Sequence, residues 1–135
     1  MKVHGFHHVA IQVRALEDVA SFYTEVLGLP ELERHHAADG TLRSIWLDVG
    51  DEGFLALERV AQAPAPDPSF RDGRPGVFLV ALRIDAAERA RVRAELERRG
   101  IALVHETRWT MYVRDPEGNR VALSHHPDGD SHSAR

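Results

Sequence analysis

The chain has 135 residues, of which 43% are hydrophobic and 28% charged, with a net charge of −4 and no cysteine. This length allows one compact domain or two very small ones that share a core. The composition excludes disulfides and cysteine-based sites, and the acidic balance argues against nucleic acid as the main partner. The apolar runs are strand-length, which argues against a membrane span. Because the first residues also lack the apolar stretch of a signal peptide, we expect a cytoplasmic protein.

Residues 1–60 show the pattern of one strand, one helix and three further strands. Residues 6–13 are rich in Val and Ile and predict the first strand. Residues 16–27 carry apolar side chains at the i, i+3, i+4 and i+7 spacing of a helix, and Gly28 followed by Leu29 and Pro30 indicates its end. The later strands are predicted at residues 31–36, 42–49 and 54–60, and a Gly-rich turn joins the last two.

Residues 61–76 separate this first module from a second one. Four prolines in the stretch favour extended chain with few hydrogen bonds, so we interpret it as a connector. Residues 77–126 then form the second module, and the polar residues 127–135 are predicted to fray.

The second module repeats the order of the first. A strand is predicted at residues 77–84, and a helix runs from there to about Arg99. Asp85 and Glu88 have the spacing of a capping box, and Gly100 ends the helix as Gly28 ended the first. The remaining strands are predicted at residues 101–106, 110–114 and 120–124, with a Pro- and Gly-containing turn before the last.

Two short sequence echoes relate the modules. Residues 8–11 resemble residues 79–82, and residues 54–57 resemble residues 120–123. A repeat of this kind indicates one structural unit written twice, and neither copy can bury its sheet alone. The predicted fold class is α+β: two paired βαβββ modules forming curved mixed sheets around a cup, with the helices outside.

Residues 6–11, 21–29 and 112–119 resemble the vicinal oxygen chelate superfamily, and the resemblance extends over residues 5–125. This superfamily includes glyoxalase I, bleomycin-resistance proteins, fosfomycin-resistance enzymes, methylmalonyl-CoA epimerase and extradiol dioxygenases. The resemblance implies the paired-module fold and commonly a dimer, so we expect a homodimer. It does not imply one reaction, because a fold hosts many functions.

The resemblance also locates a metal site. In the metal-dependent members, four side chains on the inner sheet faces hold a divalent ion, and two His with two Glu is a common set. The corresponding positions here are His8, Ala56, Leu79 and Ala122. Only His8 has a donor atom, so we predict that the family's metal is absent and that no cofactor is bound. A displaced metal site of His8, Glu58 and His126 is an alternative that needs a bulge or register shift to converge.

The cup is expected to hold a small aromatic or amphipathic molecule. Residues that share a strand face with the four positions are its predicted lining, because side chains alternate along a strand. The predicted ligand-binding residues are His8, Gln12, Trp46, Ala56, Glu58, Leu79, Arg83, Met111, Ala122 and Ser124. On the strand at residues 110–114, either Met111 and Val113 or Tyr112 and Arg114 face inward, and the sequence leaves both open.

Some of these side chains suggest how a ligand is held. Trp46 and Trp109 are candidates for stacking on a flat ligand, or are core aromatics. Arg83 or Arg114 offers a bidentate fork to a carboxylate or phosphate, or is an ordinary surface arginine.

Three functions fit these observations. The first, which we favour because three metal positions lack donors, is a metal-free binding protein of the bleomycin-resistance type. The second is an enzyme, either a metal-dependent lyase, isomerase or dioxygenase with the displaced site, or a metal-free one that uses His8 or Glu58 as acid–base. The third is a subunit or regulatory domain whose cup is filled by its own side chains.

Overall fold

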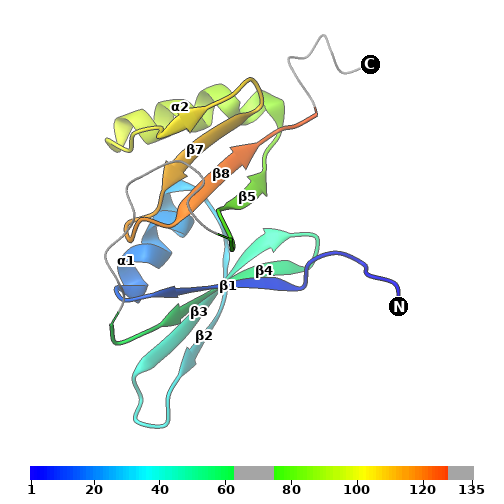
Figure 1. The fold of residues 1–135 in the computed structure, drawn as a ribbon. Helices are drawn as coiled ribbons and strands as arrows, with labels where there is room; N and C mark the ends of the chain where they lie inside the picture. Colours follow the sequence, from blue (N-terminus) through cyan, green and yellow to red (C-terminus); the bar gives the residue numbers. More distant parts are fainter. Residues whose placement is uncertain (63–74, 128–135) are drawn as a thin grey trace. The chain divides into compact units, whose positions relative to one another are not determined.

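The computed structural model describes residues 1–62 and 75–127. The chain divides into two compact units, Met1–Ala65 and Pro66–Arg135 (Figure 1). Each unit contains one strand, one helical segment and three further strands in that order, so the predicted α+β class and the two βαβββ modules are confirmed. Most of the predicted connector and tail, residues 63–74 and 128–135, lies outside the described residues. No helix in the described ranges is long and apolar enough to cross a membrane.

The first unit is a four-stranded mixed sheet with one helical segment. Its strand order is β1-β4-β3-β2, with β1 parallel to β4 and the other pairs antiparallel. The predicted helix is present, but it continues beyond Ser21 as a π-helical turn, and Gly28 follows with a φ of +77°. The elements are β1 (His8–Val13), α1 (Leu16–Ser21), the π-helical turn (Phe22–Val26), β2 (Glu31–His36), β3 (Leu42–Gly50) and β4 (Gly53–Arg59).

The core of the first unit lies between α1 and one face of this sheet. Strand side chains alternate between faces, so Ile45 and Leu47 of β3 point to the core together with Leu57 of β4, and all three are fully buried. The hairpin between β3 and β4 turns at Asp51 and Glu52, which both have positive φ, as the tight turns that match strand twist require. The opposite face of the sheet, which we call the open face because α1 does not cover it, carries Ala10, Trp46, Ala56 and Ser44, of which Ala56 and Ser44 are buried.

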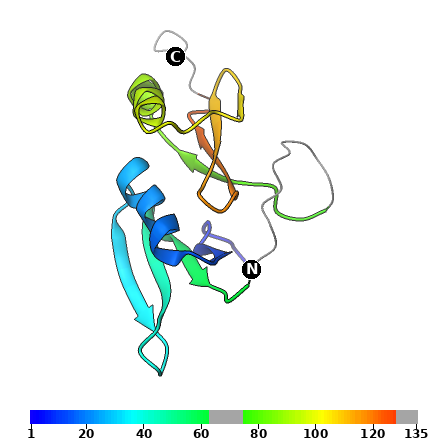
Figure 2. The same cartoon turned by 90° about the vertical axis from the view of Figure 1, so that its left-hand side faces the viewer.

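The second unit repeats this topology. Its strand order is β5-β8-β7-β6, again with the first strand parallel to the last. Figure 2 shows each helix alongside its own sheet. The elements are β5 (Val80–Arg83), a 3₁₀ turn (Ala86–Glu88), α2 (Arg89–Arg98), β6 (His105–Glu106), β7 (Thr110–Arg114) and β8 (Arg120–Ser124).

Three details of the second unit differ from the prediction. β5 begins at Val80 rather than at residue 77, and β6 contains only residues 105–106 of the expected 101–106. The predicted capping box is wrong, because Asp85 has extended backbone at the N-cap position but its side chain caps nothing. The Glu88 carboxylate accepts hydrogen bonds from Arg91 instead of reaching back.

The predicted turn between β7 and β8 is confirmed and is organised by Asp115. Its carboxylate accepts hydrogen bonds from the backbone N–H groups of Glu117 and Asn119 at 3.0 and 2.9 Å, and from the Asn119 side chain at 2.8 Å. Gly118 has a φ of +85°, a conformation that glycine adopts without strain. This turn fixes the register of β7 against β8, and with it the face on which each side chain lies.

Candidate functional site

The open face of the first sheet brings together the site residues predicted from residues 1–60. Ala56 of β4 lies between Ala10 of β1 and Trp46 of β3 in the strand register. One step along the strands, His8 lies beside Phe54. One step in the other direction the register aligns polar side chains, namely Gln12, Glu58 and Ser44. Two alanines therefore separate aromatic side chains from polar ones.

The aromatic side chains form a continuous row across all four strands. The ring centroids of His35 and Trp46 are 4.4 Å apart, those of Trp46 and Phe54 are 4.4 Å apart, and those of Phe54 and His8 are 4.8 Å apart. The Phe54 and His8 rings are stacked with an interplanar angle of 10°. Such ring pairs add to the stability that burial alone provides. We call these four residues the aromatic row.

His8 has a second neighbour in His7. The two Nδ1 atoms are 2.8 Å apart, so one imidazole donates a proton and the other accepts it. His8 is exposed and lies at one end of the aromatic row.

Two buried polar atoms next to the alanines lack partners. The Ser44 hydroxyl and the Trp46 indole N–H have no hydrogen-bond partner within residues 1–62 and 75–127, although both atoms are buried. The great majority of buried polar groups are paired, and each unpaired one costs about 1–3 kcal/mol. The Trp46 indole N–H, which is a hydrogen-bond donor, and the Ser44 hydroxyl, which is a donor and an acceptor, therefore lie near Ala56. A ligand bound there could form hydrogen bonds with both.

The open face of the second sheet carries three of the remaining predicted residues, Arg83, Ala122 and Ser124. Ala122 lies between Ala81 of β5 and Tyr112 of β7. Two residues further along β8, Ser124 pairs with Arg83 of β5. The Ser124 hydroxyl accepts a hydrogen bond of 2.8 Å from Thr110 of β7. Leu79 directly precedes β5.

The register also decides which residues of β7 face inward. Tyr112 pairs with Ala122, so Tyr112 and Arg114 share the open face. Met111 and Val113 are fully buried and point to the opposite side. Met111 is therefore a core residue and does not join the predicted ligand-binding set on this face. Tyr112 occupies the position beside Ala122 that Met111 was expected to share.

Sequence reasoning missed Phe54 and His35, and it left open whether Tyr112 or Met111 faces inward. Phe54 was detectable, because it lies two residues before Ala56 and so shares its face. His35 joins Trp46 only through the pairing of β2 with β3, which contains irregularities. Tyr112 required the register of β7 against β8.

The residues present do not fit the divalent metal of the resemblance. Ala56, Leu79 and Ala122 carry no donor atom, and no group of three His, Asp or Glu side chains in residues 1–62 and 75–127 is placed to hold an ion. The alternative metal site of His8, Glu58 and His126 does not form either, because His8 and Glu58 lie too far apart. His8 aligns with Phe54 whereas Glu58 aligns with Gln12, a separation of four residues or about 13 Å along the strands.

Comparisons with known proteins agree with this fold. The model of the Glyoxalase/Bleomycin resistance protein/Dioxygenase superfamily matches residues 5–123. A glyoxalase/dioxygenase structure from Nostoc punctiforme has a TM-score of 0.76 at 22% identity, covering 93% of this chain and 92% of that one. A lactoylglutathione lyase from Agrobacterium tumefaciens has a TM-score of 0.65 at 23% identity, covering 93% and 96%.

A more distant likeness is to a fosfomycin resistance protein, FosX, from Listeria monocytogenes. That structure holds Mn(II) and 1S,2S-dihydroxypropylphosphonic acid, and it has a TM-score of 0.69 at 12% identity, covering 91% of this chain and 93% of that one. No curated protein shows a significant match to the chain. At these identities the solved structures show a shared fold.

Proposed function

The chain belongs to the Glyoxalase/Bleomycin resistance protein/Dioxygenase superfamily, and on this premise we propose that it binds a small, flat aromatic or amphipathic molecule without the family's metal. The observation that carries the proposal is the aromatic row beside two alanines. Ala56 is one of the positions at which the resemblance places a metal ligand, and here it presents only a methyl group next to Trp46.

The side chains around Ala56 suit such a ligand. A flat apolar ring placed over Ala10 and Ala56 would contact the aromatic row, where stacking adds about 0.5–1.5 kcal/mol per ring pair. The Ser44 hydroxyl and the Trp46 indole N–H would then find partners among the ligand's polar atoms. Removing the cost of two unpaired buried groups strengthens binding, so the ligand should carry at least one hydrogen-bond acceptor.

The lack of metal-ligating atoms at three of the family's four positions favours a binding protein over an enzyme. Holding a molecule requires affinity alone, whereas the family's metal chemistry requires ligands that Ala56, Leu79 and Ala122 do not supply. The proposed function is therefore sequestration, as in bleomycin-resistance proteins. Ligand contacts of Leu79, Arg83, Ala122 and Ser124, a homodimeric assembly and a cytoplasmic location stay predictions.

Metal content tests the metal-free part of the proposal. Protein purified without a chelating tag is offered Mn, Fe, Co, Ni and Zn separately and then dialysed. We expect less than about a tenth of an equivalent for every metal, because one imidazole does not hold an ion through dialysis. About one equivalent that is lost in His8→Ala and kept in the control His36→Ala would overturn it.

A substitution over the alanine pair tests the ligand site. Calorimetric titration with 2-naphthol as a flat probe should show binding to the unaltered protein. Ala10→Leu places a branched side chain where the probe would lie, so we expect affinity to fall by about tenfold or more. Ala38→Leu adds the same atoms at an exposed turn residue and should leave affinity unchanged. No binding, or an equal loss in both variants, would contradict the site.

A further inference from the structure

The second unit contains a hollow beside the first turns of α2. Its volume is about 500 Å³, within the range of small-molecule sites. Three alanines form one part of its lining, namely Ala86 and Ala87 of the 3₁₀ turn and Ala90 of α2. The rest of the lining is polar, and its members are Arg89, Arg93, Arg108 and His125.

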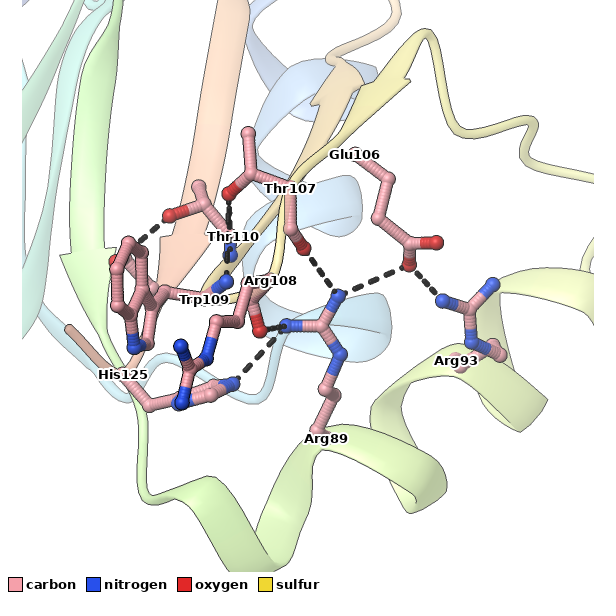
Figure 3. Close-up of polar contacts among 9 residues, drawn as sticks. Arg89, Arg93, Glu106, Thr107, Arg108, Trp109, Thr110 and His125 are labelled. Carbon is pink, nitrogen blue, oxygen red and sulfur yellow. Dashed lines mark hydrogen bonds and ion pairs between the residues drawn. The ribbon is translucent and has the colours of Figure 1, made fainter. Parts of the chain in front are cut away.

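Arg89 links the two segments that line the hollow through hydrogen bonds. Its Nη1 donates to the backbone carbonyl of Arg108 at 3.2 Å and to the His125 ring at 3.0 Å. Its Nη2 donates to Glu106 at 3.0 Å and to the carbonyl of Thr107 at 2.9 Å (Figure 3). All four terminal N–H groups are therefore engaged, so Arg89 positions the segment after β6 against the helix rather than receiving a ligand.

Arg93 and Arg108, by contrast, keep donors available. Arg93 uses one terminal nitrogen on the Glu106 carboxylate, whose same oxygen also accepts from Arg89 (Figure 3). Arg108 lies over the Trp109 ring at 5.1 Å. In the part of the chain that the structure describes, the Arg108 guanidinium has no acceptor. An unpaired guanidinium offers a fork of donors that matches carboxylate and phosphate oxygens.

The charge balance of the hollow favours an anion. Three guanidinium groups line it, and one carboxylate, Glu106, compensates part of their charge. His125 is 5% exposed, and its Nε2 accepts from Arg89, because a guanidinium has donors only. The net charge at neutral pH is therefore positive, while the alanines offer apolar contact.

This hollow is separate from the open face of the second sheet. His125 follows Ser124 directly, and successive strand side chains point to opposite faces. Ser124 lies on the open face with Arg83, whereas His125 points toward α2 and Arg89.

We propose that this hollow is a second binding site, for a small organic anion. The guanidinium groups of Arg93 and Arg108 receive its carboxylate or phosphate, and the three alanines contact its short apolar part. The site goes beyond the proposed function, because it uses other residues and another ligand chemistry.

Titration with three probes of one chain length tests the site. Butyrate, n-butyl phosphate and 1-butanol are added to ¹⁵N-labelled full-length protein, and amide shifts are followed by NMR. We expect saturable shifts at Ala87, Ala90 and His125 with one or both anions and none with the alcohol. The stronger anion identifies carboxylate or phosphate as the preferred head group. Shifts with 1-butanol equal to those with the anions, or no shifts at all, would overturn the proposal.

Three arginine variants provide the matched comparison. Arg108→Gln removes a guanidinium that makes no ion pair with the residues that the structure describes, so the fold should be kept and affinity should fall by about three- to tenfold. Arg93→Gln should weaken binding similarly. Arg91→Gln removes an equal charge from the same helix, but Arg91 does not line the hollow and is 73% exposed. An equal loss in Arg91→Gln would show unspecific charge attraction and contradict the site, as would full affinity in Arg108→Gln.

Discussion

The two units share a backbone plan but place different chemistry on it. In the first unit, Trp46 stands beside an alanine pair on the open face of its sheet. In the second, Tyr112 stands beside an alanine pair at the same position in the same strand order. The small residues next to a large ring are therefore a property of the repeat.

The residues that flank this shared arrangement differ. Two positions before its central alanine, the first unit has Phe54, which stacks on Trp46 and His8. The second unit has Arg120 there, whose guanidinium lies 4.5 Å from the centre of the Phe78 ring. One sheet presents aromatic rings where the other presents a cation, so a duplicated framework can divide ligand contacts between two chemistries.

The helices are also held in different ways. The first helical segment buries a set of apolar side chains, Leu16, Val19, Ala20, Phe22 and Tyr23. In α2 the single buried residue is Leu96. Arg89 supplies a polar attachment instead, through its bonds to residues 106–108 and His125. Apolar burial fixes one helix and a hydrogen-bonded guanidinium fixes the other.

Truncating the apolar attachment should give the largest effect. Tyr23 is 1% exposed, so Tyr23→Ala should lower the free energy of unfolding of the first unit by about 3 kcal/mol. The chain has two tryptophans, and a Trp109→Phe background leaves Trp46 as the reporter in urea titrations. Glu25→Ala on the exposed side of the same turn should change stability by less than about 0.5 kcal/mol. A loss below about 1 kcal/mol for Tyr23→Ala would contradict the apolar attachment.

Removing the polar attachment should cost the second unit somewhat less. Arg89→Met keeps the aliphatic stem but leaves two carbonyls and the buried His125 without the Arg89 donor, while Glu106 keeps its pair with Arg93. We therefore expect a loss of about 2 kcal/mol. Trp109 reports this unfolding in a Trp46→Phe background. Arg91→Met is the control, since Arg91 is exposed and, among the described residues, pairs with Glu88 of its own helical segment. Equal stability of the two variants would show that α2 is held in another way.

The sequence predicted most of the fold because its signals were local. The strands at residues 110–114 and 120–124 were predicted to the residue, since alternating side chains flank a turn with Asp115, Pro116 and Gly118. The capping box failed because Glu88 has a competing partner one turn away in Arg91. The sequence pattern of a capping box does not account for a second partner that competes for the Glu88 carboxylate.

The site was predictable only along each strand. Alternation predicted that Ala56 and Glu58 share one face of β4 and that Trp46 and Ser44 share one face of β3. The pairing of the two strands places all four on the same side of the sheet. The aromatic row depends on neighbours across strands, and Met111 was assigned to the face that Tyr112 holds, since a register slip of one residue exchanges the faces. Register is set by pairing between distant residues, which one sequence does not reveal.

Exchanging the flanking residue tests whether the aromatic row sets ligand chemistry. Phe54→Arg gives the first sheet the residue that the second has at the same position. We expect the affinity for 2-naphthol to fall by about three- to tenfold, or about 1 kcal/mol, since one ring pair is lost. Phe6→Arg makes the same change at an 89% exposed residue and should have no effect. Unchanged affinity in Phe54→Arg would separate the row from ligand binding.

The smallest effect should come from the ion pair between α1 and β2. The Arg34 guanidinium donates hydrogen bonds to Glu17 at 2.6 and 3.2 Å and thereby holds the pKa of that carboxyl below its ordinary value of 4.5. A carboxyl whose pKa is lower in the folded state stabilises the protein above its unfolded pKa, and the contribution disappears as pH falls through the folded pKa. Glu17 is 61% exposed, so the contribution should be no more than about 0.5 kcal/mol.

Urea titrations of Glu17→Gln and the unaltered chain at pH 7 and near pH 3 check this. The gap in unfolding free energy should be present at pH 7, narrow toward pH 3, and shrink at pH 7 in high salt, because exposed pairs are screened. Asp18→Asn removes a neighbouring charge that makes no such bond with the described residues, and it controls for the helix dipole.

In the second unit Glu95 has a pKa lowered to about 2 by hydrogen bonds from Arg98 and Arg99 of the same helical segment. The difference in unfolding free energy between Glu95→Gln and the unaltered chain should therefore persist to lower pH than the difference for Glu17→Gln. The reverse order would contradict the assignment of the two pairs.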